Sequence, residues 1–174
     1  NNVKAKNFTQ TFRDMNIATV PVNLFANNPE VTSFNGLFTG CTELETVPAD
    51  LFKNNQNVTD FKWLFYATDV KDLPVGLFKH CPSGKAIQIN QIFQNAIIED
   101  FPEGFFEGLD GVTSLYSVFE SAVFMKPLKG GIFKGMAKAN VLTQAFYRTN
   151  VTDLPENLFE GMGKNASTIS LKST

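Results

Sequence analysis

The chain is poor in the residues that build disulfide scaffolds, metal centres and catalytic pairs. Its 174 residues include two cysteines (Cys41 and Cys81), one histidine (His80) and one tryptophan (Trp63). Two cysteines are too few for a disulfide framework or a zinc knuckle. His80 and Cys81 are neighbours in a predicted exposed turn, without the rigid frame and orienting third residue that a Cys–His nucleophile needs. We therefore expect no metal, no cofactor and no enzymatic activity.

An excess of positive charge and long apolar runs are missing as well. The formal net charge is −2, with both signs scattered along the chain, so no concentrated basic surface is available for nucleic acid. No stretch approaches the roughly 18 to 20 consecutive apolar residues of a membrane helix. Hydrophobic residues nevertheless make up 43% of the chain and charged residues 18%, which is enough apolar material for a packed core.

The chain also has no initiator methionine, because it begins Asn1-Asn2-Val3. We interpret it as a piece excised or processed from a longer protein, so the lack of a targeting segment does not indicate the cytoplasm. Near the other end, residues 166–169 restart a pattern found throughout the chain, which predicts that related sequence follows.

Phenylalanine is abundant, with 18 residues, and its placement is periodic. The segment Pro-x-x-Leu-Phe, or a close variant of it, recurs along the chain and always closes on a phenylalanine. The closing residues are 26 to 28 apart: Phe25, Phe52, Phe78, Phe106, Phe133 and Phe159. A single unit of this size cannot enclose a core, whereas stacked units can. The chain therefore predicts one solenoid domain over 1–174, made of six repeats of about 27 residues.

A second apolar pattern runs at the same period and predicts the local structure. In every repeat two apolar residues stand four apart: Phe8/Phe12, Phe34/Phe38, Phe61/Phe65, Ile89/Phe93, Leu115/Phe119 and Leu142/Phe146. This spacing places both side chains on one face of a helical turn, and proline favours the start of a second one at Pro-x-x-Leu-Phe. The segment between them, such as 44–47, is expected to be short and extended. The predicted fold class is α/β, with short helical turns and short parallel strands.

The two cysteines fall in different positions of the repeat. Cys41 occupies a position filled elsewhere by small or apolar residues: Met15, Thr68, Ala96, Ala122 and Thr149. We interpret it as a buried packing position. A disulfide between Cys41 and Cys81 is not expected.

The second repeat resembles a known family. The segment Val31 to Leu44 (Val-Thr-Ser-Phe-Asn-Gly-Leu-Phe-Thr-Gly-Cys-Thr-Glu-Leu) is similar to the units of BspA-like bacterial surface leucine-rich-repeat proteins. Residues 58–70 and 112–124 share the first half of that motif. The resemblance implies a right-handed leucine-rich-repeat-like solenoid. It also implies an exported or surface-anchored bacterial protein that works by adhesion or protein binding, and it brings no catalytic residues.

Four aromatic residues lie outside the repeated apolar positions and are the candidate binding residues. They are Trp63, Tyr66, Tyr116 and Tyr147. Large aromatic side chains on a solenoid surface are suited to anchor a protein partner or a sugar ring. The alternative is that they only cover the edges of the core.

These observations favour a monomeric, extracellular or cell-surface binding module over an enzyme. The leading hypothesis is adhesion to an extracellular protein, such as a host matrix protein, over an extended face of the solenoid. The alternatives are a carbohydrate-binding module that uses the exposed aromatic residues, and a passive spacer that binds nothing.

Overall fold

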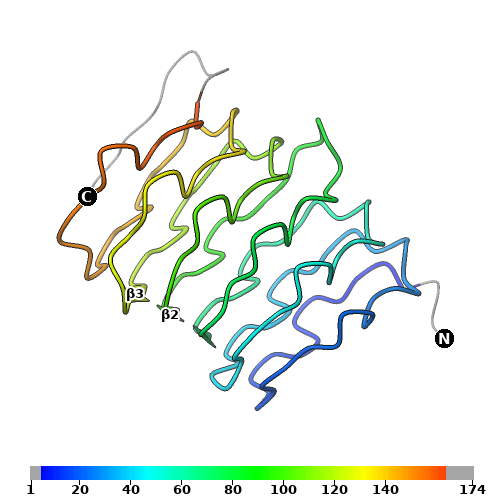
Figure 1. The fold of residues 1–174 in the computed structure, drawn as a ribbon. Helices are drawn as coiled ribbons and strands as arrows, with labels where there is room; N and C mark the ends of the chain where they lie inside the picture. Colours follow the sequence, from blue (N-terminus) through cyan, green and yellow to red (C-terminus); the bar gives the residue numbers. More distant parts are fainter. Residues whose placement is uncertain (1–4, 164–174) are drawn as a thin grey trace.

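The computed structural model describes residues 5–163, which form a stack of coils, one coil per repeat (Figure 1). Three neighbouring coils contribute the short strands β1 (Asp69–Val70), β2 (Ile97–Ile98) and β3 (Val123–Phe124). The strands form one parallel sheet in the order β1-β2-β3. The restart of the repeat at 166–169 lies outside the described residues.

Parallel pairing continues beyond this sheet and keeps the coils in register. Isolated parallel bridges join Asn7 to Ser33, Ser33 to Asp60, and Asp60 to Gln88 in the first four coils. Each bridge therefore pairs equivalent residues of two successive repeats, which lie on neighbouring rungs of the stack. A parallel-stranded solenoid with coils of 26 to 28 residues is a leucine-rich-repeat-like architecture.

Asn150 ends the three-stranded sheet with its side chain. Its Oδ1 accepts a hydrogen bond from the Phe124 N–H (2.8 Å), and its Nδ2 donates to the Phe124 carbonyl (2.9 Å). A primary amide has the same donor and acceptor as a peptide group. The Asn150 side chain thus replaces the next strand and satisfies the outer edge of β3, which would otherwise be open for pairing.

The helical turns predicted from the sequence are not formed, since none of residues 5–163 is helical. We call the seven residues that begin at the first member of each apolar pair the pair turn, for example 61–67 in the third coil. There the N–H groups of Phe65 and Ala67 donate to carbonyls of the next coil, at Ile92 (2.9 Å) and Gln94 (2.9 Å). A helix would direct these groups to the fourth preceding carbonyl of its own turn. The predicted helical turns are therefore wrong at the backbone level.

Left-handed residues at two fixed positions explain the difference. The third and seventh residues of every pair turn have positive φ, between 51° and 70°. The third position holds Gln10, Gly36, Trp63, Gln91, Ser117 and Gln144. The seventh holds Asp14, Gly40, Ala67, Asn95, Ser121 and Arg148. A positive φ at the third residue of a four-residue turn is what a type II turn requires. The pair turn is therefore a series of tight turns. Each turn begins two residues after the previous one, and the backbone does not wind into a helix.

The Pro-x-x-Leu-Phe segments also form tight turns. The N–H of Leu24 donates to the carbonyl of Pro21 (3.0 Å), and Leu51 and Leu158 do the same to their prolines. Here the coils approach closely enough to require glycine. A Cβ at Gly108, whose φ is +95°, would lie 2.1 Å from the Phe78 carbonyl oxygen of the preceding coil.

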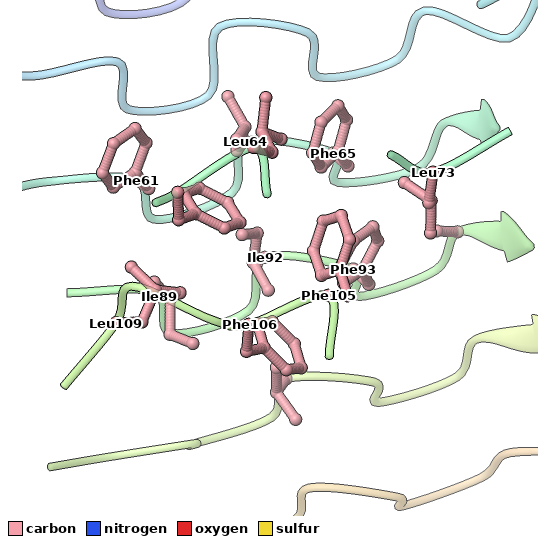
Figure 2. Packing of buried hydrophobic residues seen from close by; sticks show 14 of the residues in the cluster. Phe61, Leu64, Phe65, Leu73, Ile89, Ile92, Phe93, Phe105, Phe106 and Leu109 are labelled. Carbon is pink, nitrogen blue, oxygen red and sulfur yellow. The ribbon is translucent and has the colours of Figure 1, made fainter. Parts of the chain in front are cut away.

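Stacked phenylalanine rings fill the interior, as the sequence predicted. The second members of the apolar pairs form a continuous column through all six coils, with ring centroids 5.3 to 6.0 Å apart. The column consists of Phe12, Phe38, Phe65, Phe93, Phe119 and Phe146. Phe93 lies in the middle of the column and also contacts Phe105 from the rest of its own coil (Figure 2). The ring of Phe101, also from that coil, contacts Phe93 as well.

The prediction that Cys41 occupies a buried packing position is confirmed. Its side chain is fully buried, and its thiol donates to the carbonyl of Phe12 at 3.0 Å. Cys41 and Cys81 are both free cysteines.

Truncation of the central ring tests this packing. Phe93→Ala removes a fully buried side chain, so we expect a loss of about 3 to 5 kcal/mol of unfolding free energy. Phe12→Ala is the matched control, because the same column position in the first coil is only half-buried. It should lose clearly less. The urea-unfolding midpoint measures both, and equal losses would contradict a continuous column centred on Phe93.

Candidate functional site

A pocket of about 420 Å³ lies on the face formed by the pair turns. It is lined by Gln10, Arg13, Thr39, Trp63, Tyr66, Gln91 and Gln94, which come from the first four coils. All seven occupy the third or the sixth position of a pair turn. Stacking in register therefore brings together residues from four successive repeats of the sequence.

Glycine in the second coil leaves room for the Gln10 side chain, which lines the pocket. The third position holds Gln10 in the first coil and Trp63 in the third, but Gly36 between them. Rungs of a parallel stack are about 4.8 Å apart, so the backbones of Gln10 and Trp63 are about two rungs apart, with no side chain at this position of the coil between them. The φ of Gly36 is +60°, and a Cβ there would come within 3.0 Å of the Gln10 side chain.

The Trp63 backbone is held in a conformation that a bulky side chain rarely adopts. Its φ is +56°, and a left-handed conformation costs an L-residue about 1 to 2 kcal/mol. Three hydrogen bonds fix it: the N–H donates to Asn90 O (3.3 Å), and the carbonyl accepts from Tyr66 N–H (3.0 Å) and Thr39 Oγ1 (3.1 Å). These hydrogen bonds therefore set the direction in which the indole leaves the coil.

The polar side chains of the pocket are partly pre-arranged. Gln91 Nε2 donates to Gln94 Oε1 at 2.8 Å, and Tyr66 Oη accepts from Asn95 Nδ2 at 2.9 Å. Arg13 is paired through its Nε with Asp14 Oδ2 at 3.2 Å, so the one charged residue of the lining has its charge balanced next to the pocket. The result is a nearly neutral pocket with two aromatic rings and several amide groups.

Two of the four candidate aromatic residues meet here, and two do not. Trp63 and Tyr66 are half-buried and line the pocket, whereas Tyr116 and Tyr147 lie outside it. Tyr116 is 39% exposed, one coil beyond the pocket. Tyr147 is half-buried in the sixth coil, where the Arg148 guanidinium lies 5.0 Å from its ring centroid. Whether any of the four binds a ligand stays a prediction.

Sequence reasoning missed the polar half of the lining. Gln10, Gln91 and Gln94 attract no attention singly, because glutamine is an ordinary surface residue. The sequence pattern that could have identified them is their common place in the repeat. Glutamine recurs at the third position of the pair turn in the first, fourth and sixth coils. Reading the repeats as columns would have placed the amides beside Trp63.

The neighbouring His80 and Cys81 do not form a nucleophilic pair. The His80 side chain is exposed, and its Nε2 lies 3.9 Å from Asp50 Oδ1. Cys81 packs against the core, and burial raises the pKa of its thiol to about 12. A nucleophilic cysteine has a lowered pKa instead, because the thiolate is the reactive form.

A smaller pocket of about 230 Å³ lies between the last two coils. It is lined by residues 124–127 and 150–153, next to the amide that closes the sheet edge. None of the four candidate residues lines it. Within residues 5–163, no group of three or more His, Cys, Asp or Glu side chains could hold a metal ion, and no helix is long and apolar enough to cross a membrane.

Comparison with known proteins adds little to this geometry. The sequence matches no protein-family profile and no curated protein. Among solved structures, the fold is similar to the crystal structure of a TLR13–ssRNA13 complex, with 17% sequence identity and a TM-score of 0.36. The match covers 85% of this chain and 26% of the other, so the chain spans about a quarter of that protein. A likeness this weak carries no argument, and the solenoid is established by its own hydrogen bonds.

Stability measurements can test the left-handed conformation of Trp63. Trp63→Gly and Trp63→Ala both remove the indole, but only glycine adopts this φ without strain. We expect the glycine variant to be more stable than the alanine variant by about 1 kcal/mol, measured as the difference in urea-unfolding free energy. Gln144→Gly and Gln144→Ala, at the same position in the sixth coil, should differ in the same direction. An alanine variant as stable as the glycine variant at Trp63 would contradict a left-handed backbone.

Proposed function

We propose that the chain is a non-enzymatic binding module that works outside the cell, with its ligand contacts centred on the Trp63–Tyr66 pocket. The observation that carries the proposal is the construction of this pocket. A left-handed backbone presents Trp63, Tyr66 lies beside it in the lining, and Gln91 and Gln94 of the same lining are hydrogen-bonded to each other. Aromatic residues in a concave site with convergent polar groups are the usual composition of a ligand pocket.

The chemistry of the lining supports binding over catalysis. The seven lining side chains include no carboxylate, thiol or imidazole. Such groups provide most general bases and nucleophiles. Amide, hydroxyl and aromatic groups instead bind and orient a ligand without activating it.

The location and the biological context of the module are proposals that rest on the sequence. The segment Val31 to Leu44 resembles BspA-like surface proteins, which supports export and adhesion at a bacterial surface. The stacked coils suit this use, because a solenoid offers an extended surface on which each repeat adds contacts. An extracellular partner, such as a host matrix protein or a glycan, is the ligand that this context favours.

A binding screen with pocket variants tests the proposal. The purified chain is screened against immobilised extracellular-matrix proteins and a glycan array, and each ligand found is titrated against the variants. Trp63→Gly should weaken binding at least tenfold, because a central aromatic anchor contributes about 2 kcal/mol or more. Gln144→Gly makes the same backbone substitution outside the pocket and should bind as the unmodified chain does.

Two results would contradict the proposed function. One is a set of ligands whose affinity is equal for the Trp63→Gly and Gln144→Gly variants, which would place binding elsewhere on the solenoid. The other is the absence of binding to any matrix protein or glycan tested, which would favour a passive spacer.

A further inference from the structure

We propose that the ligand of the Trp63–Tyr66 pocket is a neutral sugar ring of a glycan; this inference rests on the proposed function and specifies its ligand. Three properties of the lining support it: the amide content, the aromatic surfaces and the lack of net charge. Each matches a different property of a pyranose ring.

The amides match the hydroxyl groups of a sugar. A hydroxyl both donates and accepts hydrogen bonds, and the glutamine side chain also carries both a donor and an acceptor. The Gln91–Gln94 bond uses one Nε2 donor and one Oε1 acceptor. Gln91 Oε1 and Gln94 Nε2 therefore remain to serve a ligand, at a spacing fixed by the bond between the two side chains. Neighbouring hydroxyls of a sugar ring can engage such a pair together.

The aromatic residues match the apolar face of the ring. A pyranose presents C–H groups on its faces, and these carry a small positive charge, whereas the face of an aromatic ring is negative. Trp63 supplies the larger surface. Tyr66 is held by the amide hydrogen bond that its oxygen accepts from Asn95, so its O–H hydrogen is left to donate to a ligand. One pocket thus offers both an apolar contact and hydrogen bonds.

The charge of the pocket favours a neutral ligand. Arg13 is the one formally charged residue in the lining, and the Asp14 carboxylate 3.2 Å from its Nε brings the local net charge to zero. An anionic ligand would compete with this carboxylate for the guanidinium. A protein side chain that anchors an interface would find a mostly polar lining, because six of the seven residues end in amide, hydroxyl or guanidinium groups, whereas anchor pockets are mainly apolar.

The shape of the pocket suits a ring at the end of a chain. Its volume of about 420 Å³ falls at the small end of the roughly 300 to 1,000 Å³ of ligand pockets. It runs across the coils, from Gln10 and Arg13 in the first to Gln91 and Gln94 in the fourth. The terminal ring of a sugar chain can lie against Trp63 and Tyr66, within reach of the amides of the first and fourth coils.

Trp63 provides a direct readout, because it is the only tryptophan of the chain. Its fluorescence is titrated with glucose, galactose, mannose, N-acetylglucosamine and N-acetylgalactosamine, and with oligomers of each. Concentrations up to about 50 mM cover millimolar dissociation constants. We expect at least one neutral sugar to change the emission in a saturable manner. Because the ligand is uncharged, its affinity should agree within about twofold between 0.05 and 0.5 M NaCl.

Amide variants show whether the sugar is bound as proposed. Gln91→Ala should weaken the sugar about tenfold, which corresponds to the loss of a buried hydrogen bond. Gln144→Ala, a glutamine at the same position of a distant coil, should leave the affinity unchanged. Both variants keep Trp63, so the fluorescence readout remains valid.

The outcomes separate this inference from the proposed function. If a protein ligand changes Trp63 emission and none of the sugars does, the glycan inference is wrong while the pocket remains the binding site. If an acidic sugar binds and loses about tenfold affinity at high salt, the ligand is charged and the inference is again wrong. If neither proteins nor sugars change the emission, both proposals fail.

Discussion

The structure depends on how the backbone N–H groups of each pair turn are shared between two coils. Two residues four apart adopt a left-handed φ. From the first of them to the second, the backbone N–H groups donate alternately to the next coil and to a turn within their own coil. In the third coil, the N–H groups of Trp63, Phe65 and Ala67 reach the next coil, while those of Leu64 and Tyr66 close turns within their own coil. Every coil is therefore locked to its neighbour, which holds the phenylalanine column and the pocket in register.

The left-handed conformation links this constraint to the candidate site. Glycine would be the unstrained choice at all twelve left-handed positions of the six pair turns, yet only two of them, Gly36 and Gly40, are glycine. Both lie in the second coil, where Gly36 leaves room for the Gln10 side chain that lines the pocket. Trp63 occupies the same position one coil later, and hydrogen bonds to the neighbouring coils hold its backbone in place. The same backbone position thus contributes Gln10, Trp63 and Gln91 to the lining of the pocket.

Much of this could be predicted from the sequence, because the repeat period and the apolar positions are visible in it. The solenoid, the phenylalanine core and the packing position of Cys41 follow from which residues recur. The local backbone did not follow, because a four-residue apolar spacing fits both a helical turn and two successive tight turns. Apart from Gly36, Gly40, Asp14 and Asn95, the left-handed positions hold residues such as Gln and Ser, which do not by themselves predict a positive φ. The amide half of the pocket was hidden for a related reason, since it forms only when the turns of different coils are aligned.

The most direct test of the central claim is to observe the hydrogen bonds between coils in solution. Scalar couplings across hydrogen bonds can be measured by NMR on protein labelled with ¹⁵N and ¹³C. The structure predicts a coupling between the Phe65 amide nitrogen and the carbonyl carbon of Ile92, whose oxygen lies 2.9 Å from that nitrogen. A coupling from Phe65 to the carbonyl carbon of Phe61 would show a helical turn instead and would contradict the account.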